Sequence, residues 1–319
     1  MSKVSIQGIG CVTPWGNEIN QVYQSWIQGN IETYNVADFE PSKYFKYKGI
    51  KHISKTTKMA LSSTWLALQD YAGDYRAWDK ERVGVFVGNS IGYLNEVYEF
   101  LDVAYEQGAD FVSPKKFTNT VLNNIPGWVS IVFGIKGINL LLQNGVTSSL
   151  DAIEAASMYL NNHVIDYAIV IGADETKGPI LENNIDKKFN IISESSVSFV
   201  LSREEINSNY GYLEVLDTWQ DYKINEKDYF TKINKVLSGK TFEHAFYGSG
   251  NFLDTCSPSI LNDYARETSN TYSVFGNTLS VSSLIKAMLA LKKQGNHIVL
   301  DANQIGNKGL MAVYKGVKE

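Results

Sequence analysis

Cysteine and histidine are scarce in this chain of 319 residues, which holds only two cysteines and four histidines. Cys11 stands at the end of a predicted strand and Cys256 in a predicted loop, so we expect reduced thiols rather than a disulfide. The histidines are scattered and include no pair at the spacing of metal ligands. The sequence therefore predicts neither a disulfide framework nor a metal site.

Blocks of like charge and long apolar runs are also missing. The 34 acidic and 29 basic residues give a net charge of -5 without a run that would suggest a nucleic-acid-binding arm or a polybasic anchor. The opening MSKVSIQGIG lacks the basic start and apolar stretch of a signal peptide, and no segment is long and apolar enough to span a membrane. We expect a cytoplasmic protein with no nucleic-acid partner and no membrane span.

Short apolar runs bounded by glycine alternate with helical patterns in the first part of the chain. Hydrophobic residues make up 44% of the sequence, enough to bury a substantial core. The pattern predicts sheets covered by helices, an α/β protein. The predicted strands are VSIQGIG, RVGVFVGNS, Ile138–Leu142, Tyr167–Ile171 and Ser196–Leu201, and the predicted helices are Gln21–Gln28, Thr56–Tyr71 and Ser149–Leu160.

The pattern begins again after the charged turn SREEINSN. No low-complexity linker separates the two parts, so we expect halves at 1–205 and 206–319 that pack as one unit. The second half has strands at Tyr212–Thr218, HAFYGSG, His297–Leu300 and Leu310–Tyr314, with helices at Glu226–Leu237 and Leu279–Lys293.

Six segments resemble, in the same order, those of the β-ketoacyl synthases, the condensing enzymes of fatty-acid and polyketide synthesis. They are VSIQGIGCVTPWGN, KTTKMALSSTWLAL, RVGVFVGNSIG, FVSPKKFTNTVLNNIPGWVSIVFGIKG, YAIVIGADE and SESSVSFVLSREE. The resemblance implies a thiolase-like fold, in which two βαβαβαββ halves form five α/β/α/β/α layers, usually in a dimer. The second half is shorter here than in typical members of the family.

The nucleophile of that family is a cysteine followed by small hydroxyl residues at the start of a helix. A helix N-terminus favours the thiolate through its free N–H groups and its dipole. The matching stretch here is NGVTSSLDAIEAA, and the nucleophile position holds Val146. A valine side chain cannot attack an acyl thioester.

Four further positions of the family's active site also differ. The two histidines that serve decarboxylation and the oxyanion correspond to Tyr247, in FYGSGNFLD, and Asn277, in VFGNTLSVSSLIKA. The family's lysine before the second histidine corresponds to Tyr272, and its helix glutamate to Lys286. The resemblance therefore implies a chain that is not an enzyme of the Cys-His-His type.

Other residues offer alternative chemistry. His244 lies three residues before Tyr247, where a buried or surface histidine is the ordinary interpretation and a catalytic one the alternative. Thr147 or Ser148 could act as a hydroxyl nucleophile only beside a base, and otherwise caps the helix.

A basic edge around His52, flanked by Lys51 and Lys55, is either solvated or a docking place for an acidic acyl carrier protein.

Taken together, the changes resemble the chain-length factor, the inactive ketosynthase-like half of type II polyketide synthases, and above all its short form in aryl polyene systems. That factor commonly has glutamine where this chain has Val146. The resemblance implies a heterodimer with an active ketosynthase, and contact through that partner with a carrier protein bearing a phosphopantetheine-bound acyl chain. GIGCVTPWGN lacks the GxGxxG spacing, and we expect no cofactor.

Two alternatives remain at this point. One is an acyltransferase or hydrolase built around Tyr247 or His244, and the other is a homodimer that binds an acyl chain or a carrier protein.

The resemblance also places two segments at the partner. The first would bound the partner's acyl tunnel, or else simply pack within the subunit, and the second is the strand that pairs across the dimer in relatives. The predicted tunnel and interface residues are Phe117, Thr118, Val121, Leu122, Asn139, Leu140, Leu141 and Leu142.

Overall fold

The computed structural model describes residues 3–29, 31, 33–37, 39–176, 192–204, 206–221, 226–250, 253–303 and 306–315. Within these residues the strands form one ten-stranded sheet in the order β3-β2-β4-β5-β1-β6-β10-β9-β7-β8. The strands are β1 (Val4–Val12), β2 (Val83–Gly88), β3 (Asn139–Leu142), β4 (Tyr167–Asp174), β5 (Ser195–Arg203), β6 (Gly211–Gln220), β7 (Phe242–Tyr247), β8 (Ala265–Asn270), β9 (Asn296–Ala302) and β10 (Asn307–Lys315).

The two halves of the sheet repeat one another. Strands β3, β2 and β4 are parallel and continue antiparallel into β5 and β1, while β8, β7 and β9 are parallel and continue antiparallel into β10 and β6. The halves join where β1 pairs with β6, with Val4 opposite Leu213. The division of the chain after residue 205 stays a prediction.

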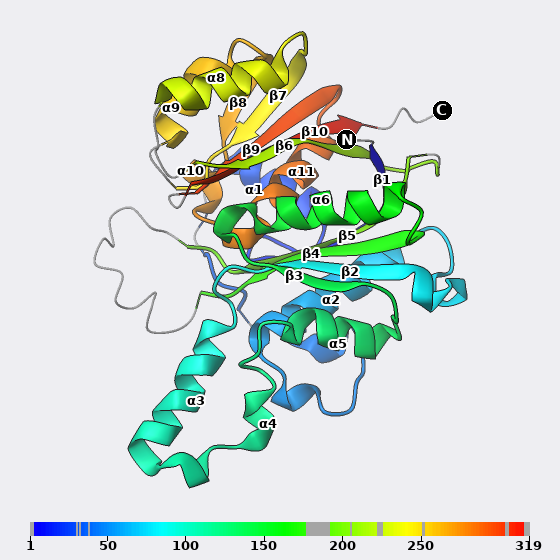
Figure 1. Cartoon of the computed structure of the whole chain (residues 1–319), viewed down its shortest axis with the longest axis vertical. Helices are drawn as coiled ribbons and strands as arrows, with labels where there is room; N and C mark the ends of the chain where they lie inside the picture. The colour runs from blue at the N-terminus through cyan, green and yellow to red at the C-terminus, as the bar shows by residue number, and fades with distance from the viewer. Residues whose placement is uncertain are drawn as a thin grey trace.

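Helices cover both outer faces and fill the space between the halves, as Figure 1 shows. Helices α2 and α5 lie outside the first half, α8 and α9 outside the second, and α1, α6 and α11 between them. The predicted α/β/α/β/α arrangement is confirmed. The helices are α1 (Ile19–Gln28), α2 (Lys55–Asp70), α3 (Leu94–Gln107), α4 (Pro114–Phe117), α5 (Asn124–Phe133), α6 (Ser148–Asn161), α8 (Glu226–Leu237), α9 (Leu253–Leu261), α10 (Tyr272–Phe275) and α11 (Ser282–Lys292).

Glycines in β1 let helix α2 approach the sheet closely. A Cβ atom at Gly8 would lie 2.3 Å from the carbonyl oxygen of Ala67, and one at Gly10 would lie 2.1 Å from that of Ser63. Only glycine leaves room for this contact. The GIG segment of the first predicted strand therefore sets the distance between the first sheet and its outer helix.

Helices α3 and α4 form an arm that extends away from the body of the molecule (Figure 1). Its apolar side chains are largely exposed, including Tyr105, Phe111 and Phe117. No helix among the described residues is both long enough and apolar enough to cross a membrane.

One prediction about a thiol was wrong. Cys256 lies in α9 rather than in a loop, because this helix continues through an internal proline, Pro258. Cys11 lies in β1 as predicted, and within the described chain neither thiol takes part in a disulfide.

Candidate functional site

A sharp turn carries the chain from the end of β3 into α6. Gly145 has a left-handed backbone, with φ at 67°, and opens a short 3-10 turn, η6 (Gly145–Thr147), directly before α6. Ser148 fixes this turn, since its Oγ donates to the carbonyl oxygen of Gly145 at 2.7 Å and accepts from the N–H of Asn144 at 2.8 Å. The turn thus places residue 146 at the N-terminus of α6.

Val146 is 6% exposed and presents only methyl groups at this position. The free N–H groups at the N-terminus of α6 would stabilise an anion at this position. The side chain of Val146, however, has no atom that can act as a nucleophile or carry a negative charge. The neighbouring hydroxyls are engaged in the turn, since Thr147 Oγ1 donates to the carbonyl oxygen of Asn144 at 3.1 Å. Neither hydroxyl caps α6, because no side-chain hydrogen bond caps the start of this helix, so the capping interpretation was wrong and both hydroxyls stabilise the preceding turn instead.

Tyr247 and Tyr272 lie at neighbouring strand ends. Tyr247 ends β7 and is buried, and Tyr272 begins α10 just after β8. The N–H of Thr271 donates to the carbonyl oxygen of Tyr247 at 2.8 Å. A Cβ atom at Gly250 would lie 2.6 Å from the ring of Tyr272, so this loop passes directly beside the ring.

Asn277 organises the approach to α11. Its Oδ1 accepts from the N–H of Leu279 at 2.9 Å, and Leu279 opens the turn η7 (Leu279–Val281). Turn η7 packs against η6, the turn that holds Val146. The structure therefore brings the Val146 turn and the segment after Asn277 together.

Lys286 forms a buried ion pair that the sequence did not reveal. Its Nζ lies 2.5 Å from Oδ1 of Asp301 in β9, and the two side chains are 1% and 0% exposed. Hydroxyls surround the carboxylate: Ser282 Oγ donates at 2.7 Å, Ser249 Oγ at 3.0 Å, and Ser283 Oγ also donates to it. This network joins α11 to β9 and to the loop after Tyr247.

A second buried carboxylate ties two loops to the end of β4. Asp174, at the end of β4, accepts from the backbone N–H groups of Ile91 and Gly92 at 2.8 Å each, and from Ser280 Oγ at 2.5 Å. Burial raises the pKa of Asp174, and the hydrogen bond from Ser280 opposes that rise. Asp174 therefore positions η7 against the loop that follows β2.

His244 lies inside a polar cluster on β7 and β8. Its Nε2 is 2.8 Å from Oγ of Ser269, and its Nδ1 is 2.9 Å from Oε2 of Glu267. The ammonium of Lys293 lies 2.7 Å from the same Nδ1 and 2.8 Å from Glu267. Burial, and then the charge of Lys293, lower the pKa of His244, so the neutral ring is favoured.

The predicted tunnel segment turns its apolar side chains outward. Phe117 is 55% exposed and Leu122 is 49% exposed, while Val121 is half-buried and Thr118 is exposed. Asn119 does not face outward, because its side chain is buried and donates to the carbonyl oxygen of His52 at 2.7 Å. Packing within the subunit therefore leaves about half of the surface of Phe117 and of Leu122 exposed.

Strand β3 ends the sheet within the described chain, and one side of its backbone faces outward. The N–H of Val85 in β2 donates to the carbonyl oxygen of Ile138 at 2.7 Å, and that of Asn89, directly after β2, donates to Leu142 at 3.1 Å. Because backbone groups alternate along a strand, Asn139 and Leu141 direct their N–H and C=O groups away from β2. The side chains of Leu140, Leu141 and Leu142 are half-buried.

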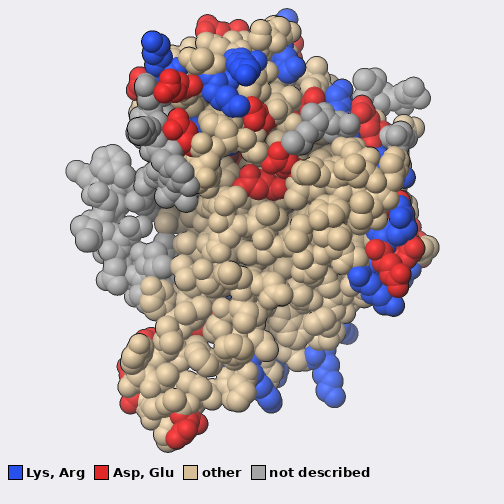
Figure 2. Space-filling view, in the orientation of Figure 1, with Lys and Arg blue, Asp and Glu red and all other residues tan. Residues whose placement is uncertain are grey.

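Figure 2 shows that a broad face of the molecule is nearly free of charged side chains. Helix α5, strand β3 and helix α6 lie on this face in Figure 1. We call this the uncharged face. Helices α5 and α6 each carry a strongly exposed apolar side chain, Ile131 at 60% and Met158 at 55%. Depletion of charged residues and exposed apolar side chains are typical of protein interfaces.

The basic edge is only partly available. Lys51 and His52 are exposed, but Nζ of Lys55 lies 2.5 Å from Oε1 of Glu194, which is buried. Lys55 therefore neutralises a buried carboxylate. The exposed ammonium group that this basic edge offers to a partner is that of Lys51.

Comparison with known proteins points to one family. Residues 33–188 match the model of the β-ketoacyl synthase N-terminal domain. The 3-oxoacyl-[acyl-carrier-protein] synthase 2 of Coxiella burnetii is 25% identical over 194 residues, which span 56% of this chain and 47% of that protein. The match thus covers about half the length of this relative.

Two solved structures share the fold over nearly the whole chain. One is a type II polyketide synthase carrier protein in complex with its ketosynthase bound to the hexaketide, with a TM-score of 0.85, 17% identity and coverage of 99% of this chain and 100% of that chain. The other is the ishigamide ketosynthase/chain length factor, with a TM-score of 0.84, 18% identity and the same coverage.

Proposed function

We propose that this chain, which belongs to the β-ketoacyl synthase family, is a non-catalytic subunit that pairs with an active β-ketoacyl-acyl-carrier-protein synthase. It would shape the acyl tunnel of the pair in polyene, polyketide or fatty-acid-type biosynthesis. The observation that supports this most is the intact turn around Val146, which holds a side chain without nucleophilic atoms at a helix N-terminus. A turn that keeps its geometry but holds no nucleophile is what we expect of a subunit whose role is structural.

The surface supports the same proposal. The uncharged face includes strand β3, whose outward edge is unpaired within the described chain, and the neighbouring helices α5 and α6 carry the exposed side chains of Ile131 and Met158. Strand addition at such an edge would satisfy the outward backbone groups of Asn139 and Leu141. A partner subunit that covered both the strand edge and the apolar side chains would stabilise this protein by burying them in an interface.

The arm supports the proposed contribution to the tunnel. Phe117 and Leu122 project from the segment that follows α3, and the ring of Phe117 contacts that of Phe100 at 6.0 Å between centroids. We propose that these apolar groups bound the far end of the partner's acyl chain. Their replacement by larger or smaller side chains would then alter product length.

The test is a condensation assay on the complex of this chain with a ketosynthase that retains Cys-His-His. Changing the partner's catalytic cysteine to alanine should abolish condensation, while Val146→Ala in this chain should leave the rate within about twofold, since no bond to the substrate forms there. Loss of condensation with Val146→Ala in a complex that still assembles would contradict the proposal.

A second candidate function rests on His244, whose ring lies between a serine hydroxyl and a glutamate. Ser269, His244 and Glu267 have the spacing of a nucleophile, a base and an orienting carboxylate. Lys293 opposes this function, because an ammonium that donates to Nδ1 leaves the proton on Nε2, where the base must accept one. Thioester hydrolysis by the isolated chain that disappears with Ser269→Ala would favour this candidate.

A further inference from the structure

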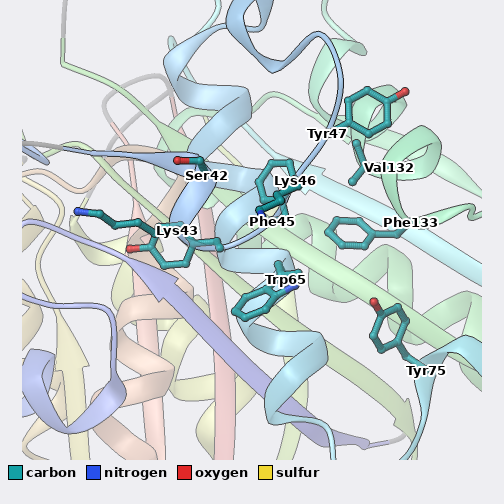
Figure 3. A pocket seen from close by; sticks show the side chains of 10 residues that line it. Ser42, Lys43, Phe45, Lys46, Tyr47, Trp65, Tyr75, Val132 and Phe133 are labelled. Carbon is teal, nitrogen blue, oxygen red and sulfur yellow. The ribbon is translucent and has the colours of Figure 1, made fainter.

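An aromatic cavity lies on the outer layer of the first half, away from the Val146 turn. It has a volume of about 440 Å³ and is bordered by the segment 42–47, helices α2 and α5, and Tyr75. Figure 3 shows Phe45, Trp65 and Phe133 around a common opening, with Tyr47 and Val132 toward one end and Lys43 toward the other. Ligand pockets in proteins are about 300–1,000 Å³, so the size fits a small molecule.

The walls of the cavity are aromatic side chains that pack only partly against the hydrophobic core. Trp65, Tyr47, Tyr75 and Phe133 are half-buried and pack with one side against the core under α2 and α5. Their remaining ring surface faces the opening. Such surfaces favour flat, unsaturated groups, because offset stacking and edge contacts add to the burial of apolar area.

Two kinds of donor accompany the rings. The hydroxyl of Tyr75 and the indole N–H of Trp65 make no hydrogen bond to another group within the described part of the chain. Lys43 and Lys46 also line the cavity, and both are exposed. Glu40 lies 3.6 Å from Lys43 and forms a solvent-exposed pair with it, which leaves Lys46 as the freer cation.

Lysine predominates in the segment that borders the cavity, although Lys43 and Lys55 are paired with Glu40 and Glu194. Residues 41–69 contain six lysines and neither aspartate nor glutamate, although the whole chain carries a net charge of -5. A local positive potential on an acidic protein selects for a negatively charged ligand. Stacking surfaces and positive charge together define a ligand with a flat apolar body and an acidic group.

We propose that the aromatic cavity, lined by Phe45, Trp65, Tyr75, Phe133 and Lys46, binds a planar aromatic carboxylate. The rings hold the body of the ligand, and the carboxylate meets Lys46 with the Tyr75 hydroxyl as a neutral donor. This site shares no residue with the Val146 turn, so its occupation is independent of the proposed pairing with a ketosynthase.

The experiment is isothermal titration of the full chain, alone or in its native complex, with trans-cinnamate as the probe. Cinnamyl alcohol is the neutral counterpart, and octanoate is a flexible counterpart with the same charge. We expect cinnamate to bind about tenfold more tightly than either, because each counterpart lacks one of the two recognition elements. Equal binding of cinnamyl alcohol or of octanoate would overturn the proposal.

Variants locate the site. Trp65→Ala should weaken cinnamate binding about tenfold, and Lys46→Glu should weaken cinnamate but not cinnamyl alcohol. Phe111→Ser, at an exposed aromatic residue on the distant arm, is the matched control and should change nothing. Lys46 is exposed, so its variant tests the site even where Trp65→Ala fails to fold. Unchanged cinnamate binding in Lys46→Glu would refute the assignment.

Discussion

The ammonium of Lys286 lies 2.5 Å from the carboxylate of Asp301, and the protein buries both groups almost completely. In the family resemblance, position 286 is that of a glutamate on the helix that follows the second histidine. Here a cation occupies it and is satisfied by Asp301, Ser282 and the carbonyl oxygen of Leu300. At the position that the resemblance assigns to that glutamate, this helix carries a buried structural ion pair.

Removing one member of this pair should destabilise the protein strongly. Lys286→Met leaves the carboxylate of Asp301 buried without its cation, which typically costs about 3–5 kcal/mol of unfolding free energy. Urea denaturation measures the loss. Lys292→Met, on the exposed end of the same helix, is the control and should change the unfolding free energy by less than about 0.5 kcal/mol. A small effect at Lys286 would show that the pair is not essential.

Stability should fall as the pH is lowered below neutrality because of His297. Burial lowers the pKa of this histidine in β9 to about 4. Between about pH 6.5 and pH 4 the unfolded chain takes up a proton that the folded protein excludes, so the unfolding free energy declines across this window and levels off below it. His244, whose pKa is also lowered, contributes with the same sign.

His297→Leu should flatten this dependence when the unfolding free energy is measured between pH 4 and pH 7. The exposed His52 offers a control, since His52→Gln should keep the slope of the wild-type chain. An unchanged slope in His297→Leu would mean that other groups set the acid sensitivity.

Val146→Cys should yield a thiol without condensation activity. The new cysteine would sit at the N-terminus of α6, where its thiolate is favoured, so we expect alkylation by iodoacetamide. Condensation needs more than the thiolate, and the resemblance assigns the positions of the two family histidines to Tyr247 and Asn277. Product analysis with a malonyl-charged carrier protein checks this. Turnover by the single variant alone would mean that another residue performs decarboxylation.

The outward N–H of Leu141 should be needed for pairing. Leu141→Pro removes this donor from the edge of β3, whereas Leu141→Ala keeps it and shortens the side chain. We expect the first variant to lose the ketosynthase in co-purification and the second to retain it. Retention by both would show that the edge of β3 is not part of the interface.

Local sequence signals predicted much of this fold. The helix predicted near Glu226–Leu237 is confirmed with those bounds, and the turn before α6 follows the interpretation that the family resemblance of NGVTSSLDAIEAA suggested. Strand β8 was missed, since ARETSN is an edge strand whose polar residues give no apolar pattern. Helix α9 was missed because Pro258 interrupts its helical signal.

Contacts between distant segments could not be predicted in the same way. Nothing in the sequence says that Lys286 meets Asp301, because the pair forms only when α11 packs on β9. The partners of His244 are likewise brought together by the pairing of β7 with β8. Sequence reasoning proposed which positions differ from the family, and the structure shows what the residues at those positions contact.

The most direct measurement is the native mass of the species recovered when this chain is co-expressed with an intact Cys-His-His ketosynthase, beside the mass of each chain alone. A one-to-one complex, formed by a chain that behaves poorly when expressed alone, is the predicted result. A stable homodimer of this chain that leaves the ketosynthase unbound would contradict the proposed pairing and favour a homodimer that binds an acyl chain or a carrier protein.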